Sequence, residues 1–256
     1  MELLESPLLA AFPHGFTTRA GGVSAPPFDS LNLGGAVGDD PARVAENWRR
    51  LEARTGLRFA RVRQVHGTRA VLADAPCEPC EEADAVVTAA AGVAACVSVA
   101  DCVPVLLADP GSGGVAAVHA GWRGTLAGAA AEGVLALRRE LGAPAARLLA
   151  VVGPSIGPCC YEVSEDVAAP FRARLGSDVV REAPSGAGGG PHLDLWAANA
   201  RVLDRAGVAP ERVHVMGACT SCGRDRFYSH RRDRGRTGRQ VAFIAPRAPT
   251  RGGGVL

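Results

Sequence analysis

The sequence contains no lysine and almost no net charge. All 28 basic residues are arginine, and 26 acidic residues nearly balance them, which leaves a formal net charge of +2. The electrostatic field of a chain with so little net charge gives no reason to expect a nucleic acid or an anionic membrane as the main partner. The absence of lysine carries no functional information by itself.

Long apolar segments are also missing. The start, MELLESPLLAAFPHG, lacks the basic segment and long apolar run of a secretory signal. The longest weakly polar stretch, 85–100, is bounded by Asp84 and Asp101 and is shorter than the roughly 20 residues that a membrane-spanning helix needs. We therefore expect a soluble, cytoplasmic protein. In that compartment the eight cysteines are better interpreted as thiols, metal ligands or core residues than as disulfides.

The sequence shows neither internal repeats nor a dividing linker, so we expect a single domain over 1–256. Strand and helix patterns are mixed along the chain, which predicts an α/β or α+β fold. Hydrophobic periodicity, caps and turn residues predict strands over 61–67, 93–100, 103–108 and 115–118, helices over 41–55 and 126–141, and a flexible loop over 184–191.

Three side chains of types that often bind metals lie at the ends of predicted strands. Cys102 and His119 belong to the central stretch 97–124, and His66 ends the strand predicted within 61–67, just before Gly67. Two imidazoles and a thiolate suit Zn²⁺, and three protein ligands leave a fourth position open, as in catalytic sites. Because the three residues lie 36 and 17 positions apart, spacing alone also allows hydrogen-bonded strand histidines and a small core cysteine.

A second interpretation uses the same side chains. Cys102 and His119 would form a nucleophile and its base, with Asp101 as the orienting carboxylate. This interpretation competes directly with metal binding.

Two Cys-x-x-Cys pairs could each supply two of the four ligands of a four-cysteine zinc site. They are Cys77-x-x-Cys80 and Cys219-x-x-Cys222, and 138 residues separate them. That separation is far beyond the usual spacing of about 15 to 20 residues. We therefore interpret the first pair as loop cysteines and the second as part of a turn.

Seven arginines lie between Arg224 and Arg239, with only two aspartates among them. Most are expected on a solvated face, and one or two are candidates to hold a phosphate bidentately. Phe227 and Tyr228 beside them also allow a nucleic-acid interpretation, but no RNA-binding or helix-turn-helix signature accompanies them. We therefore expect no nucleic-acid partner.

Several long motifs resemble one family over nearly the whole chain. The chain is similar to the YfiH or laccase-domain family, whose members have been called polyphenol oxidases, peptidoglycan-editing factors and purine nucleoside phosphorylases. The motifs are HGFTTRAGGVS, LNLGGAVGDDP, QVHG at 64–67, ADCVPVLLAD at 100–109, VHAGWRGT at 118–125, GPSIGPCCYEV at 153–163, and FYSHRRD with TGRQ at 227–240.

The resemblance implies a cytoplasmic zinc enzyme whose layered sheets are flanked by helices, as in cytotoxic-necrotizing-factor-type hydrolases. Motif by motif, the metal ligands fall on His66, Cys102 and His119. Cys102 and His119 are also the catalytic candidates, and Asp101 is a candidate for proton transfer because it adjoins a ligand. The candidate substrate-binding residues in these motifs are Gln64, Arg123 and Tyr161.

The activity implied by the resemblance is phosphorolysis of adenosine, inosine, guanosine or methylthioadenosine, together with deamination of adenosine. The partners would be a nucleoside and phosphate, and no oligomeric state follows. Zinc suits both reactions. It lowers the pKa of a bound water to about 7 and so supplies a hydroxide for attack on C6 of adenine. In phosphorolysis it would orient phosphate or polarise the substrate.

Copper-dependent phenol oxidation is a weaker expectation. The sequence has only six histidines, no His-x-His pair, and only Met1 and Met216 as possible axial ligands. Two further alternatives are a peptidoglycan-editing hydrolase in which Cys102 attacks an amide or ester, and a zinc-stabilised protein without turnover if four protein ligands close the metal site.

Overall fold

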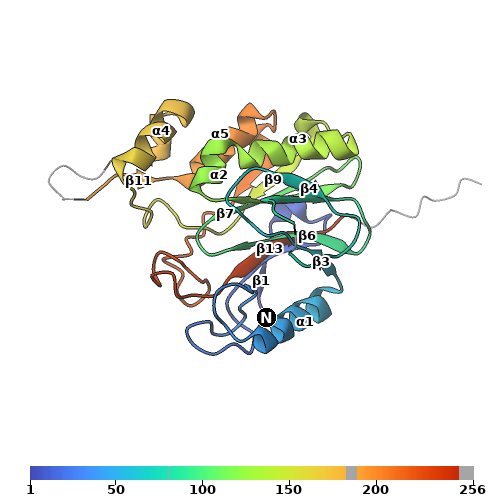
Figure 1. Cartoon of the computed structure of the whole chain (residues 1–256). Coiled ribbons are helices and arrows are strands. Elements are labelled where there is room, and N and C mark those ends of the chain that lie inside the picture. The colour runs from blue at the N-terminus through green and yellow to red at the C-terminus, as the bar shows by residue number, and fades with distance from the viewer. Residues whose placement is uncertain (80, 183–188, 248–256) are drawn as a thin grey trace, which may run out of the picture.

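The computed structural model describes residues 1–79, 81–182 and 189–247. Two sheets lie face to face, with one group of helices above them and a single helix below (Figure 1). Cys80 and most of the predicted loop 184–191 lie outside the described residues.

One sheet has five strands in the order β1-β2-β13-β6-β3. All neighbours are antiparallel except β3 and β6, which are parallel. The strands are β1 (Leu3–Leu4), β2 (His14–Thr17), β13 (Gln240–Ile244), β6 (Val93–Val99) and β3 (Arg58–Ala60).

The other sheet has six strands in the order β12-β9-β7-β8-β5-β4. The pairs β12–β9 and β4–β5 at its two edges are parallel, and the inner pairs are antiparallel. The strands are β12 (Val213–Val215), β9 (Leu149–Val152), β7 (Val103–Ala108), β8 (Val115–Ala120), β5 (Ala85–Thr88) and β4 (Ala70–Leu72), and a separate ribbon pairs β10 (Val180–Arg181) with β11 (His192–Leu193).

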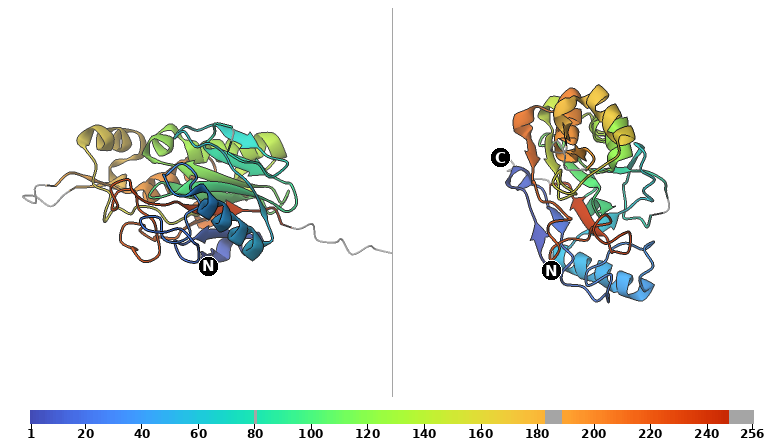
Figure 2. Two further views of the ribbon diagram at one scale, coloured as in Figure 1. Left: turned by 60° about the horizontal axis from the view of Figure 1, so that its bottom comes forward. Right: turned by 90° about the vertical axis from the view of Figure 1, so that its left-hand side faces the viewer.

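Helices cover the outer faces of both sheets. Figure 2 shows α1 and the group formed by α2 to α5 on opposite sides of the strands. The helices are α1 (Pro41–Thr55), α2 (Trp122–Ala127), α3 (Ala129–Leu141), α4 (Glu165–Leu175) and α5 (Leu195–Arg205), and short 3₁₀ turns occupy Pro7–Leu9, Ala145–Arg147, Ser177–Val179 and Pro210–Arg212. None of the described helices has the length and apolar character needed to cross a membrane.

Strands β7 and β8 are buried on both faces, which explains why their sequences are almost wholly apolar. Along β8, Ala116 and Val118 face the helices, whereas Val115 and Ala117 face the second sheet. A third apolar cluster fills the space between α1 and the five-stranded sheet. The ends of these strands are therefore rigid supports for the loops that follow them.

Most of the predicted elements are confirmed. The strands expected over 93–100, 103–108 and 115–118 correspond to β6, β7 and β8. Helix α1 is capped at its start by Asp40, whose carboxylate accepts the Ala42 N–H at 2.8 Å, and at its end by Gly56 with φ 69°. The single helix predicted over 126–141 is wrong, because Gly128 adopts φ 91° and divides it into α2 and α3.

The strand predicted over 61–67 is also wrong. Regular pairing ends at Ala60, and only an isolated bridge between Arg63 and Glu82 remains beyond it. The backbone of Arg61 and Arg63 bonds to the segment 77–83, but these bonds do not continue into a regular ladder. The Gln64 side chain joins the segment to β6, since its amide donates to the Ser98 carbonyl at 2.9 Å and accepts the Ser98 N–H at 2.7 Å. Alternation of polar and apolar residues therefore does not correspond to a regular strand here.

Candidate active site

The three predicted metal ligands converge at one end of the six-stranded sheet. Cys102 directly precedes β7, His119 is the second-last residue of β8, and His66 lies in the irregular segment after β3. One ligand atom from each lies within 4.8 Å of the other two. Cys102 Sγ is 3.9 Å from His66 Nε2, and the two imidazole centroids are 4.9 Å apart. This set of two nitrogens and one sulfur fits the donor preference of Zn²⁺.

A buried carboxylate, Asp84, contacts the ring of His119 and the backbone of His66. It faces His119 because Ala85 pairs with Val118 between β5 and β8, and its Oδ1 is 2.8 Å from His119 Nδ1. The same carboxylate accepts the backbone N–H groups of Val65, His66 and Gly67 at 3.3, 2.9 and 2.6 Å. With Nδ1 engaged, Nε2 of His119 is the nitrogen left for a metal.

The backbone at the site is held in a sparsely populated conformation. His66 has φ 61° and Asp101 has φ 87°, values that residues with a Cβ rarely adopt. Gly121 allows the close approach of the ligands, because a Cβ there would lie 3.0 Å from the His66 ring and 3.1 Å from Cys102 Sγ. The glycine of the HAGWRG motif thus leaves room for the side chains of His66 and Cys102.

Cys102 and His119 form a strongly polarised pair. Burial alone would raise the pKa of Cys102, but the charge of His119 and hydrogen bonds from His119 and His66 lower it to about 6. Burial would lower the pKa of His119, but the Cys102 charge and the Asp84 hydrogen bond raise it to about 9. At neutral pH the metal-free site therefore contains a thiolate beside an imidazolium.

Alkylation of the metal-free protein tests this pairing. Because the thiolate is the reactive form, the rate of Cys102 modification by iodoacetamide should rise through a midpoint near pH 6 and stay constant above it. Peptide mass spectrometry measures the rate at each pH. In His119→Ala the midpoint should move upward, since the neighbouring positive charge is gone. A wild-type midpoint near pH 9 would contradict the pairing.

The cluster opens into a cavity of about 1270 Å³. Trp122 and Tyr161 contribute aromatic faces to its wall, and Arg123, Arg231 and Arg239 contribute positive charge. None of these three arginines forms an ion pair with a carboxylate in the part of the chain that the structure describes. The site therefore combines a candidate metal centre, aromatic faces and unpaired cations.

The three predicted substrate-binding residues all line this cavity. Arg123 is exposed, with its guanidinium 4.4 Å from the Trp122 ring centroid. Tyr161 lies under Arg231, 4.9 Å from its guanidinium, and burial is the main reason that its pKa rises to about 12. Gln64 bonds to the backbone of Ser98 and lines the cavity.

Asp101 lies at the cavity wall, with its carboxylate committed to neighbouring groups. It accepts Thr220 Oγ1 at 2.6 Å, Ser229 Oγ at 3.1 Å and the Arg231 N–H at 2.7 Å. These contacts join the residue beside Cys102 to the C-terminal segment. Its predicted role in proton transfer stays a prediction.

Comparison with known proteins assigns the chain to a family. The model of the family described as multi-copper polyphenol oxidoreductase laccase matches residues 13–247. The chain belongs to this family. The laccase-like family therefore accounts for the resemblance carried by the QVHG, ADC and HAGWRG motifs.

Relatives within the laccase-like family cover nearly the full length. The chain is 48% identical over 95% of its length to a protein of Deinococcus radiodurans named purine nucleoside phosphorylase, of which it covers 92%. It is 40% identical to the purine nucleoside phosphorylase YlmD of Geobacillus stearothermophilus, with 94% of this chain and 93% of that protein covered.

Solved structures share the same layered α/β fold, as the sequence predicted. The crystal structure of that YlmD protein matches with a TM-score of 0.87 and 36% identity over 95% of this chain and 94% of that one. YfiH of Bacillus licheniformis matches with a TM-score of 0.84 and 34% identity, covering 90% and 91%.

Asp84 is the residue of the site that sequence reasoning missed. Its signal was present, because an aspartate directly before the fully buried strand β5 needs buried hydrogen-bond donors. Burial tends to raise the pKa of Asp84, but the hydrogen bonds from His119 and Gly67 keep it below its ordinary value. Which donors it would meet depended on the pairing of β5 with β8.

Proposed function

We propose that this chain is a zinc-dependent purine nucleoside phosphorylase that also deaminates adenosine. The observation that carries the proposal is the His66–Cys102–His119 cluster, oriented by Asp84 and open to a cavity with unpaired arginines. Three relatives at 40–48% identity bear the name purine nucleoside phosphorylase, which supports the same reaction class.

The donor set supports zinc over copper. A blue-copper site needs a weak axial ligand such as methionine in addition to two histidines and a cysteine. Met216 instead packs between the two sheets, and neither methionine lines the described part of the cavity. A Zn²⁺ held by three protein ligands keeps one position open and supplies Lewis acidity to either reaction.

Arg239 is the strongest candidate for binding phosphate. Burial lowers the pKa of its guanidinium, although the nearby charges of Cys102 and Asp101 act in the opposite direction. Its Nη1 donates to the carbonyls of Thr237 and Gly238 at 3.1 and 2.9 Å, and no carboxylate of the described chain pairs with it. A half-buried cation without a counter-ion favours binding of an anion such as phosphate. Arg123, which is exposed, is the second candidate.

The aromatic part of the wall suits the nucleoside. Trp122 and Tyr161 line the cavity next to the cluster and offer flat apolar faces to a purine. Gln64 retains one amide N–H and one oxygen lone pair beyond its two bonds to Ser98. These groups accommodate adenosine, inosine, guanosine and methylthioadenosine without a contact that requires one particular base.

Asp101 is proposed to act mainly by positioning. Three donors satisfy its carboxylate, and its backbone carbonyl accepts the Ile156 N–H at 3.0 Å. These bonds hold Cys102 and two loops of the cavity wall together. A role in proton transfer would require the carboxylate to exchange one of these donors for substrate.

A substrate screen on zinc-loaded protein tests the proposal. With phosphate, inosine should give hypoxanthine and ribose 1-phosphate, and adenosine without phosphate should give inosine. Liquid chromatography separates the products of both reactions. If every nucleoside stays intact while a cell-wall precursor is cleaved, the nucleoside assignment is wrong.

One observation favours a second candidate function, a cysteine hydrolase of the peptidoglycan-editing type. The thiolate–imidazolium pair of Cys102 and His119, oriented by Asp84, is the arrangement of a cysteine nucleophile with its base and orienting carboxylate. The two functions differ in their response to zinc. Zinc should activate the phosphorylase and should block a hydrolase that needs a free Cys102 thiolate.

A further inference from the structure

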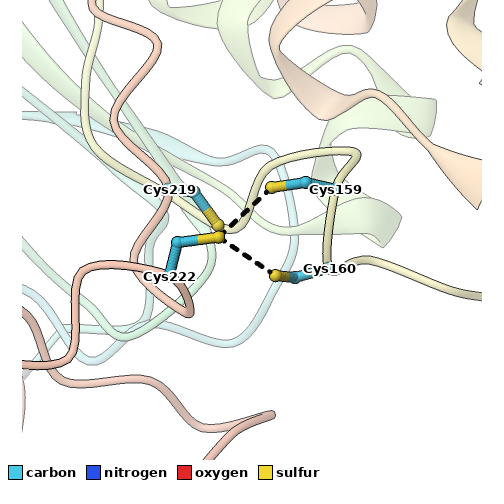
Figure 3. A group of neighbouring side chains, drawn as sticks. All are labelled: Cys159, Cys160, Cys219 and Cys222. Atoms are coloured by element: carbon cyan, nitrogen blue, oxygen red, sulfur yellow. Dashed lines mark hydrogen bonds between the residues drawn. The ribbon is translucent and has the colours of Figure 1, made fainter.

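Four cysteines outside the candidate active site gather around one point. Figure 3 shows Cys159 and Cys160 on one loop and Cys219 and Cys222 on another, with their sulfurs directed toward one another. Each sulfur lies within 4.8 Å of the other three. Cys222 Sγ is 3.5 Å from Cys159 Sγ and 3.4 Å from Cys160 Sγ.

The topology of the six-stranded sheet brings the two loops together. Strands β9 and β12 are parallel neighbours, so their carboxyl ends emerge at the same edge of the sheet. The loop after β9 contains Cys159 and Cys160, and the loop after β12 contains Cys219 and Cys222. An isolated bridge between Ser155 and Cys219 extends the contact beyond the strands.

We propose that Cys159, Cys160, Cys219 and Cys222 form a second, structural Zn²⁺ site. Four sulfurs at zinc–sulfur distances of about 2.3 Å in a tetrahedron lie roughly 3.8 Å from one another. The observed spacing brackets that value, so small side-chain movements would complete the geometry. Unlike the His66–Cys102–His119 cluster, this set supplies all four ligands and leaves no position for substrate.

A backbone hydrogen bond at the cluster supports a thiolate ligand. The Gly157 N–H donates to Cys219 Sγ at 3.2 Å. Backbone donors to sulfur are the outer contacts expected around a metal-bound thiolate. On binding, the thiols release their protons to solvent, and the dication offsets the repulsion between four thiolates.

A disulfide explains the arrangement less well. A sulfur–sulfur bond is about 2.05 Å long and would use only two of the four cysteines. The sulfurs are separate here, and Cys222 lies almost equally close to Cys159 and Cys160. A shared metal accounts for all four positions.

The proposed metal would stabilise the wall of the active site. The loop after β9 carries Tyr161, which lines the cavity, and the Ile156 N–H that binds Asp101. The loop after β12 carries Thr220, which also binds Asp101. By joining the two loops, zinc would hold both sets of contacts in place without taking part in the reaction.

Zinc content of purified full-length variants tests this site independently of the proposed function. Wild type should contain two zinc ions per chain, and both Cys102→Ala and the Cys219→Ser/Cys222→Ser double variant should contain one. Cys77→Ser, which alters an exposed cysteine elsewhere, should keep both ions. If only the four-cysteine site exists, wild type and Cys102→Ala should each contain one zinc ion and the double variant none. If only the catalytic site exists, wild type and the double variant should each contain one zinc ion and Cys102→Ala none.

Cobalt substitution and thiol titration complete the test. Co²⁺ in Cys102→Ala should show the intense visible bands of tetrahedral four-thiolate coordination, whereas the double variant, whose remaining site has a single thiolate, should show weaker and shifted bands. The zinc retained by the double variant shows that it has folded. Two zinc ions in the double variant would overturn the proposal. So would one, zero and one zinc ions in wild type, Cys102→Ala and the double variant, whether denatured wild type without reductant shows eight free thiols or six thiols and one disulfide.

Discussion

Replacing His119 by alanine is expected to abolish both phosphorolysis and deamination. The substitution removes a proposed zinc ligand and the group that pairs with Asp84. Metal catalysis contributes several kcal/mol to transition-state stabilisation, so kcat/KM for inosine and adenosine should fall by at least about 10³-fold. The measurement is kcat/KM for each substrate, together with the zinc content of the same preparation.

His214→Ala is the matched control, because His214 lies in β12 and its ring bonds to Ser6 outside the cavity. It should retain zinc and activity. Full activity in His119→Ala would contradict the assigned centre.

Asp84→Asn should weaken zinc binding and lower activity less severely than His119→Ala does. The isosteric amide keeps the shape of the side chain, but it cannot accept from His119 and three backbone N–H groups as a carboxylate does. Loss of such an outer contact weakens metal binding by roughly 10–100-fold. Excess zinc should therefore restore activity to Asp84→Asn and not to His119→Ala. Equal zinc affinity in wild type and Asp84→Asn would remove Asp84 from the site.

Arg239→Gln is expected to separate the two reactions. If Arg239 binds phosphate with charge-assisted hydrogen bonds, its loss costs about 3 kcal/mol, or about 10²-fold in kcat/KM for phosphorolysis of inosine. Deamination of adenosine needs no phosphate and should stay within about threefold of wild type, a difference below 1 kcal/mol. Initial rates at varied phosphate concentration measure the first effect.

Two further arginine variants identify the phosphate-binding residue. Arg63 lines the same cavity but forms an ion pair with Glu82 at 3.0 Å, so Arg63→Gln should leave both reactions nearly unchanged. Arg123→Gln tests the second candidate. A selective loss of phosphorolysis in Arg123→Gln, with Arg239→Gln unaffected, would transfer the phosphate-binding role to Arg123.

Features of this protein that depend on neighbouring residues could be predicted from its sequence. The apolar runs of β6, β7 and β8 and the Asp40 and Gly56 caps of α1 were predictable, because strand periodicity and helix capping are local. The three candidate metal ligands were also identified, partly from predicted strand ends and mainly from motifs shared with a family. Local patterns failed at 61–67, where Gln64 bonds to a distant strand.

Contacts between groups that lie far apart in the sequence could not be predicted in this way. The parallel pairing of β9 with β12 brings Cys219 and Cys222 to Cys159 and Cys160, and not to Cys77. The register between β5 and β8 likewise places Asp84 against His119. The physical reason is that strand order and register depend on how whole sheets and helices bury their apolar faces. That burial is a property of the packed layers, and the spacing of cysteines or acids along the chain does not encode it.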